Sequence, residues 1–281
     1  NNSQNSAARK IPTLFIPAWQ RLDKTETPTA DDFVSLKDAA FEVHTKSLFA
    51  EDLDPNSVMK GQAVMVSPAI GRLISRTDTD KPLGIVGEQY HVVQNETLHD
   101  AVQRSFYNCL HPKIANQTVL TEKLCRDGGF SRMEYRNSAL SGTIKQLNGT
   151  TTQVDFMAVV QNTQGNASVK VKAASIDISC NNILIYGTNS EASARHTENF
   201  STSEMEEFLA SEIHGFADRV DRMRKWAVSP LTSMQAEKAL QSSGHLSVTQ
   251  CGLIMDQFAE EIEARGSSLW SLYAALTAFS T

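Results

Sequence analysis

Hydrophobic and polar residues alternate with two different periods along this chain of 281 residues. Between about residues 117 and 180, apolar positions recur at every second residue, which is the spacing of strands with one buried face. After residue 200 they recur every three or four residues, as in amphipathic helices. Because strands and helices are segregated, the pattern predicts an α+β fold with a mixed α/β N-terminal part, a central curved antiparallel sheet and a helical C-terminal part.

The central sheet is predicted from extended runs that are separated by turn residues. Asn148-Gly149 lies between two alternating runs and is a strong hairpin signal, so residues 140–147 are expected to pair with 153–161. In the last run the apolar parity changes near Ala173-Ala174, which predicts a β-bulge there. The predicted strands are 117–124, 130–136, 140–147, 153–161 and 168–180.

The N-terminal part predicts smaller elements. Residues 1–32 begin with a polar segment, contain three prolines and are expected to form an irregular or disordered arm. A short helix is predicted from Phe33 to about Ala40. Residues 62–66 are expected to form a strand, and residues 72–75 are expected to form a hairpin with 83–86.

Helix signals mark the start of several further elements. Asn95 is a predicted N-cap, followed by a helical face of Leu98, Ala101, Val102, Ser105 and Phe106. Ser203 and Glu206 have the spacing of a capping box. Further helices are expected at 233–242, 247–264 and 269–279. The expected division is therefore an arm (1–32), an α+β core (33–200) and a helical region packed on it (201–281).

Motifs for known chemistry are missing from the sequence. It has no H-E-x-x-H, no phosphate-binding G-x-x-x-x-G-K-[ST], no G-x-G-x-x-G after a strand and no G-x-S-x-G. The four cysteines form no C-x-x-C, so a zinc site is not expected. No catalytic residue, metal ligand or cofactor is assigned, and a non-enzymatic protein is expected. An enzyme whose catalytic cluster assembles from distant residues stays open as an alternative.

Targeting signals are also missing. Residues 1–10 lack the apolar core of a signal peptide, and no stretch approaches the roughly 20 apolar residues that cross a bilayer. A cytoplasmic protein with no membrane partner is therefore expected.

Two segments stand out beyond these patterns, and a third closes the chain. They are Leu83 to Asn95 (LGIVGEQYHVVQN), Ile178 to Leu184 (ISCNNIL) with the nearby Arg195-His196-Thr197, and Leu269 to Thr277 (LWSLYAALT). Over roughly residues 35 to 281 they resemble a phage/plasmid-like family, domain of unknown function nine-three-two, in its "GVVG-x-x-Y-x-x-V-Q-N", "C-N-N", "R-H-T" and "W-x-L-Y-N-A-x-T" stretches. Ala274 departs from the family's usual Asn. The resemblance implies a protein of prophages and plasmids with no assigned activity.

The charge pattern suggests a partner. The net charge is -6, which argues against a basic wrapper of duplex DNA, but residues 113–197 carry 9 basic and 6 acidic side chains. This basic third coincides with the predicted sheet, although chance or a solvated sheet face explains so small an excess equally well. The pattern favours single-stranded-DNA binding or annealing in recombination, similar in kind to the RecT, Red-beta and ERF proteins of phages.

The candidate nucleic-acid-binding residues have three expected roles. Arg195 and His196 could meet a phosphate or pack on the sheet. The neighbouring Asn181 and Asn182 are not among the candidates, because adjacent asparagines suit a turn or cap at a strand end. Phe130 and Tyr135 are candidates for base stacking. The expected phosphate contacts are Arg126, Arg132, Arg136, Lys145, Lys170 and Lys172.

Two further expectations follow from the charges. Residues 198–281 carry a net charge of -6, so a basic sheet could meet the acidic helical region of a neighbour, which predicts a homo-oligomer. The alternative function is a non-enzymatic anti-defence or regulatory protein that binds a host factor.

Overall fold

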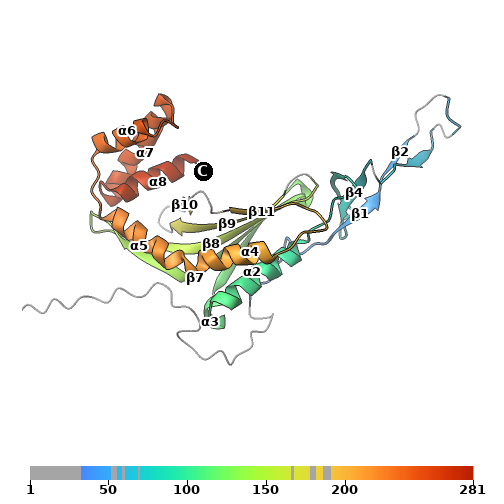
Figure 1. Ribbon diagram of the computed structural model, residues 1–281, viewed down its shortest axis with the longest axis horizontal. Coiled ribbons are helices and arrows are strands. Elements are labelled where there is room, and N and C mark those ends of the chain that lie inside the picture. Colours follow the sequence, from blue (N-terminus) through green and yellow to red (C-terminus); the bar gives the residue numbers. More distant parts are fainter. Residues whose placement is uncertain are drawn as a thin grey trace, which may run out of the picture.

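The computed structural model describes residues 33–51, 56–58, 61–68, 70–165, 168–177, 182–185 and 191–280, so the predicted arm, residues 1–32, lies outside the described residues. The chain has the expected α+β architecture (Figure 1). A large antiparallel sheet has the strand order β10-β9-β8-β7-β6, and β11 also pairs with β9. Its strands are β6 (Thr118–Cys125), β7 (Phe130–Lys145), β8 (Thr151–Thr163), β9 (Val169–Asp177), β10 (Asn182–Ile185) and β11 (Glu191–Ala194).

The predicted hairpin is confirmed, because β7 pairs with β8 across the Asn148-Gly149 turn, with Lys145 opposite Thr151. The two faces of the sheet differ as the alternation requires. The inner face, which includes Met133, Tyr135, Phe156, Ala158 and Val171, is buried. The outer face carries the residues between them, and charged side chains alternate there with uncharged ones.

Three helices cover the inner face (Figure 1). They are α2 (Asn95–Cys109), α4 (Ser203–His214) and α5 (Phe216–Ala227). The predicted apolar face of α2 is confirmed, since Leu98, Ala101, Val102, Ser105 and Phe106 are all buried. The ring of Phe156 meets Phe106 and Phe216 edge to face at centroid distances of 6.0 and 5.6 Å. Helices α4 and α5 therefore share one core with the sheet.

Apart from the short helix α3 (Pro112–Ala115), which follows α2, the remaining elements lie toward the two ends of an elongated molecule (Figure 1). At one end β1, β4 and β5 form a small antiparallel sheet and β2 pairs with β3. At the other end α6, α7 and α8 form a helical lobe with its own apolar cluster. The bounds are β1 (Val43–Ser47), β2 (Phe49–Glu51), β3 (Ala63–Met65), β4 (Arg72–Arg76), β5 (Pro82–Val86), α3 (Pro112–Ala115), α6 (Ser233–Ser242), α7 (Val248–Arg265) and α8 (Leu269–Ser280).

The helix predicted from Phe33 to Ala40 is wrong. Residues 37–39 form a turn around the carboxylate of Glu122, which accepts the backbone N–H groups of Lys37 (3.1 Å), Asp38 (2.9 Å) and Ala39 (3.3 Å). The carboxylate satisfies donors that a helix would have left to solvent.

Asn95 is not the N-cap that the sequence predicts. Gln94 occupies that position without a side-chain cap. The buried Asn95 amide instead donates to the carbonyl of Ala39 (3.2 Å) and accepts from Ser131 Oγ (2.8 Å) and Asn162 Nδ2 (2.9 Å). It thus joins the 37–40 turn, β7 and β8 at one point inside the core.

The bulge predicted near Ala173-Ala174 is also wrong. The pairing of β8 with β9 has no register shift, and the apolar parity changes because both of these alanines are buried, on opposite faces of the sheet. The shift lies in β7, after Asn137, whose Oδ1 accepts the N–H groups of Ala139 and Leu140. This bulge joins two predicted strands into one.

The predicted capping box of Ser203 and Glu206 does not form. Thr202 Oγ1 donates to Glu206 (2.8 Å), which also accepts from Arg104 (2.7 Å). Gly215 separates α4 from α5. The three helices that follow are confirmed, and α6 and α7 begin with capping boxes at Thr232 and Ser247.

The role of Asn95 predicts a large cost for its removal. Asn95→Ala leaves buried donors on Ser131 and Asn162 without their acceptor, so the free energy of unfolding should fall by about 3 kcal/mol. Urea unfolding at constant m-value measures the loss. Glu96→Gln, an exposed change on the same helical turn, should shift stability by less than about 0.5 kcal/mol. Equal stability of the two variants would contradict the role of the amide.

Candidate nucleic-acid interface

Most of the predicted phosphate contacts share the outer face of the sheet. Arg132, Arg136 and Lys145 project from β7, and Lys170 and Lys172 project from β9. The register places Arg132 opposite Gln161 of β8, which is opposite Lys170. Arg132 and Lys170 are therefore two strands apart in one row, or about 10 Å.

Carboxylates are interleaved with these cations. Glu134 lies 2.7 Å from Arg132, and Asp155 lies 2.8 Å from Arg136. Glu191 of β11 contacts both Lys170 (2.8 Å) and Lys172 (3.0 Å), and hydrogen bonds from these two lysines lower the pKa of its carboxyl group. Surface pairs such as those of Glu191 contribute about 0–1 kcal/mol each. The carboxylate of Asp155, in contrast, is fully buried beside Arg136.

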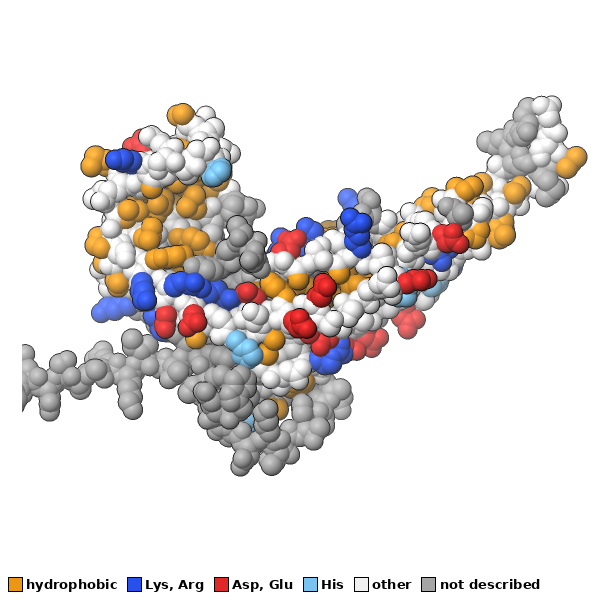
Figure 2. All heavy atoms as spheres, in the orientation of Figure 1, with side chains coloured by type: hydrophobic (Ala, Val, Ile, Leu, Met, Phe, Trp, Pro, Cys, Tyr) orange, Lys and Arg blue, Asp and Glu red, His pale blue; other side chains and the backbone are white. Residues whose placement is uncertain are grey.

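The rows flank an apolar strip. Met157, Val159 and Ala174 lie on the outer face of β8 and β9 and are buried as a small cluster. Figure 2 shows Lys and Arg side chains next to Asp and Glu over β11, and the surface is hollowed between the α6–α8 lobe and the sheet. The outer face thus has a buried apolar centre between charged margins, so the charged margins are the part of this face that a ligand can contact.

The positions of three other predicted contacts, Phe130, Arg126 and Tyr135, differ from one another. Phe130 is half-buried on the outer face, and Arg126 is exposed in the 3-10 turn Arg126–Gly128. Tyr135 is fully buried on the inner face, with its hydroxyl 2.9 Å from His99 Nδ1. Its predicted role in base stacking is wrong, because the parity of β7 turns this ring toward α2.

The predicted pair Arg195 and His196 meets the Leu83–Asn95 segment. The His196 ring stacks on Tyr90 at a centroid distance of 5.0 Å and an interplanar angle of 14°. A pocket of about 470 Å³ lies here, lined by Gln89, Tyr90, Gly165, Ser168, Arg195, His196 and Thr197. Two of the noted segments, about 100 residues apart in sequence, therefore form one site.

Hydrogen bonds fix the groups in this pocket. Gln164 Nε2 donates to the carbonyl of Val93 (2.8 Å), which turns its Oε1 toward the Tyr90 hydroxyl at 2.8 Å. The Tyr90 hydroxyl also accepts the N–H of Gly165 at 2.9 Å and lies 3.2 Å from His196 Nδ1. Burial raises the pKa of Tyr90 to about 12 and lowers the pKa of His196 to about 4, so both side chains are neutral near pH 7.

The sequence did not identify three residues that contribute to the outer face or to the pocket. Lys123 of β6 lies opposite Arg132 and contacts Glu134, and the alternation of β6 could have assigned it to the outer face. Arg72 donates to the carbonyls of Glu88 (2.6 Å) and Tyr90 (2.9 Å), and Gln164 orients Tyr90. No local sequence pattern indicates the contacts of Arg72 and Gln164. Of the asparagine pair, Asn182 begins β10, whereas Asn181 lies outside the described residues.

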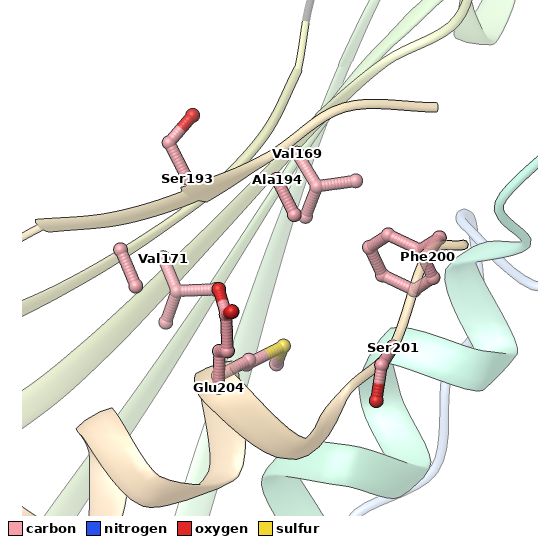
Figure 3. A pocket seen from close by; sticks show the side chains of 9 residues that line it. Val169, Val171, Ser193, Ala194, Phe200, Ser201 and Glu204 are labelled. Carbon is pink, nitrogen blue, oxygen red and sulfur yellow. The ribbon is translucent and has the colours of Figure 1, made fainter. Parts of the chain in front are cut away.

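A second cavity is much smaller. Between β9, β11 and the start of α4 lies a cavity of about 20 Å³, enough for one water molecule. Figure 3 shows Val169, Val171 and Ala194 on its sheet side and Phe200 and Glu204 on the other. Within the described part of the chain, no group of three or more His, Cys, Asp or Glu residues could hold a metal ion. Among the same residues, no helix is long and apolar enough to span a bilayer.

The fold and site define an α+β protein whose antiparallel sheet has one face under helices and one face with rows of paired charges. The model of the family DUF932, a domain of unknown function, matches residues 82–280, and the chain belongs to this family. Comparisons with curated proteins and with solved structures gave no significant match.

The low pKa of His196 predicts a pH-dependent stability. The unfolded state binds the imidazole proton near pH 6.5, whereas the folded state binds it only near pH 4, so stability falls as the pH drops between these values. The loss should reach roughly 3 kcal/mol. The groups that face the ring are Tyr90, His91 and Arg195.

His196→Phe keeps an aromatic ring but cannot titrate. The difference in unfolding free energy between wild type and this variant, measured in urea at several pH values from 7 to 4, should change by that amount. A difference that is independent of pH would show that His196 is accessible to protons in the folded state.

Proposed function

We propose that this protein binds single-stranded nucleic acid along the outer face of its sheet. The observation that carries the proposal is the placement of six cations on that one face. Three carboxylates share it: Glu134, Asp155 and Glu191. The cations are Lys123, Arg132, Arg136, Lys145, Lys170 and Lys172.

The same charges favour a single strand over a duplex. A duplex presents closely spaced phosphates and needs a strongly basic surface, whereas three carboxylates on this face repel it. A single strand can place its phosphates over the cation rows while a base stacks on an accessible aromatic ring. Phe130, half-buried at the Arg132 end of the face, is the aromatic side chain positioned to stack on a base.

Strand annealing in phage or plasmid recombination is the biological setting that we propose for this activity. Annealing requires that bases of a bound strand stay available for pairing, which a shallow sheet face permits better than a closed channel. Assembly into homo-oligomers would extend the face from one subunit to the next, and this too belongs to the proposal.

Fluorescence anisotropy with a labelled single strand of about 40 nucleotides, across a salt titration, tests the binding surface. Lys170→Ala/Lys172→Ala should weaken binding and reduce the slope of log K against log salt by about 1.4, since each lost phosphate contact in a single strand contributes about 0.7. Glu191→Gln should strengthen binding, because it releases both lysines from their partner.

Lys238→Ala provides the matched control, since this exposed lysine lies on α6, away from the sheet. A matched duplex tests the preference for single strands. Equal effects of the α6 and β9 variants, or no binding at low salt, would remove the proposal and leave a host-protein partner as the better hypothesis.

A further inference from the structure

We propose that this protein binds a second copy of itself head to tail, with the exposed face of α7 in one copy packed antiparallel against the exposed C-terminal half of α5 in the next. The inference rests on the proposed function only for the expectation of a homo-oligomer. Its evidence comes from two helices that are not part of the sheet, so it can be tested independently of the outer face.

Helix α7 buries one face and exposes the opposite one. Its buried residues, such as Ile254 and Phe258, pack in the apolar cluster of the α6–α8 lobe. The opposite face begins with two apolar side chains, Val248 (88% exposed) and Leu253 (53% exposed). Figure 2 shows hydrophobic side chains at the surface of this lobe. The N-terminal half of the exposed face is therefore suited to contact with another protein surface.

Gly252 lies between these two apolar side chains on the exposed face. Glycine in a helix interior is less stable than alanine. The φ angle of Gly252 is not positive, and a Cβ atom there would meet nothing within 4 Å. Neither the backbone conformation nor packing among the described residues therefore requires a glycine. Its missing side chain does allow the backbone of a second helix to approach closely.

The C-terminal half of the same face is acidic. Asp256, Glu260 and Glu263 are exposed, and none of them forms an ion pair with a described residue. Arg265, the single basic residue of α7, is buried and pairs with Glu261. Carboxylates three and four residues apart on a helix repel each other. A partner that brings cations would therefore stabilise this face.

The exposed side of α5 combines cations with an apolar side chain. Arg222, Lys225 and Val228 follow at intervals of three residues and are exposed, Val228 by 57%. Lys225 forms no ion pair with a described residue, whereas Arg224 pairs with Asp221 at 2.8 Å. Figure 2 shows Lys and Arg side chains gathered over α5, below the α6–α8 lobe. The charge of this surface is opposite to that of the α7 face.

The two surfaces match when the helices run antiparallel. From its N-terminal end, the exposed face of α7 presents Leu253 and then Asp256, three residues on. From its C-terminal end, α5 presents Val228 and then Lys225, again three residues apart. The next charged side chain on α7 is a carboxylate, and on the α5 surface it is an arginine. One register therefore joins apolar to apolar and carboxylate to cation, whereas a parallel pair would place apolar side chains against charges.

The contact joins two different surfaces of the chain. Such a contact repeats from one copy to the next and produces a ring or a filament. Because α5 covers the inner face of the sheet, a neighbour packed on α5 leaves the outer face open to a strand (Figure 1). Nucleic acid is a poor occupant of the α7 face, since the three carboxylates there would repel phosphates.

Sedimentation velocity of the full chain over a series of concentrations tests the contact. We expect self-association with a Kd on the order of micromolar, weaker at high salt because charges take part. Lys225→Glu and Asp256→Lys should each weaken it about tenfold or more, since each places like charges against each other. An equimolar mixture of the two variants should assemble as wild type does, because every contact between unlike copies again joins opposite charges.

Two further variants separate the contact from general effects of charge and folding. Lys238→Glu makes the same charge change on the exposed side of α6 and should leave self-association unchanged. Gly252→Gln introduces a better helix former where there is open space, so the helix content measured by circular dichroism should not fall. The added side chain blocks the close approach, so self-association should still weaken about tenfold.

The outcomes that overturn the contact are distinct from those that overturn the proposed function. A wild type that stays monomeric throughout the series, or a mixture that assembles no better than its two components, overturns the contact. Weaker strand binding by Lys225→Glu with unchanged self-association also overturns it and makes nucleic acid the ligand of α5. If strand binding still depends on Lys170 and Lys172, the outer face keeps its role. Assembly that the mixture restores, without any strand binding, supports the contact and removes the outer face as a strand-binding surface.

Discussion

The pairing of β7 with β8 is the constraint on which the rest of the structure depends. The ladder runs from Phe130 opposite Thr163 to Lys145 opposite Thr151. A slip of one residue would turn the charges of the outer face into the core and the aromatic rings of the inner face into solvent. The same ladder ends beside Gln164, so the register of the sheet also sets the position of Tyr90 and His196.

The two candidate sites use charge in different ways. On the outer face, Glu134, Asp155 and Glu191 pair with arginines and lysines, so the net attraction for an anion is small, and salt screens the exposed cations. In the pocket, burial keeps Tyr90 and His196 neutral, and directed hydrogen bonds hold the Tyr90 hydroxyl in place. The first arrangement is the basis of the strand binding that we propose, and the second fixes the position of a buried hydroxyl group.

Much of the architecture could be predicted from the sequence, because period-two alternation and the Asn148-Gly149 turn specify the hairpin directly. The fold class, the central strands and the helices after Pro230 were accessible for this reason. Two of the errors concern polar side chains whose partners are distant in sequence. Glu122 shapes a turn more than 80 residues away, and Asn95 serves three separate segments instead of capping its own helix. Such contacts depend on tertiary structure and leave no local pattern.

The candidate sites could be predicted only in part, because they too depend on contacts between segments that are distant in sequence. Alternation places Arg132, Lys170 and Lys172 on one face, but it cannot show that Glu191 is their shared partner. The parity of β7 could have excluded Tyr135 as a stacking residue, since it shares a face with Met133. The meeting of Tyr90 with His196 depends on the paths of two loops, which no spacing rule describes.

The segment from Tyr90 to Gln94 has no regular secondary structure, yet it is bonded to the core along its length. The N–H of His91 donates to the carbonyl of His196, and the carbonyl of Val93 accepts from both Asn162 and Gln164. Gln94 exchanges two hydrogen bonds with the backbone of Val43. Opening this loop therefore means opening the edge of the core, and the amide hydrogen of His91, which is bonded to His196, should exchange with solvent as slowly as that of a strand.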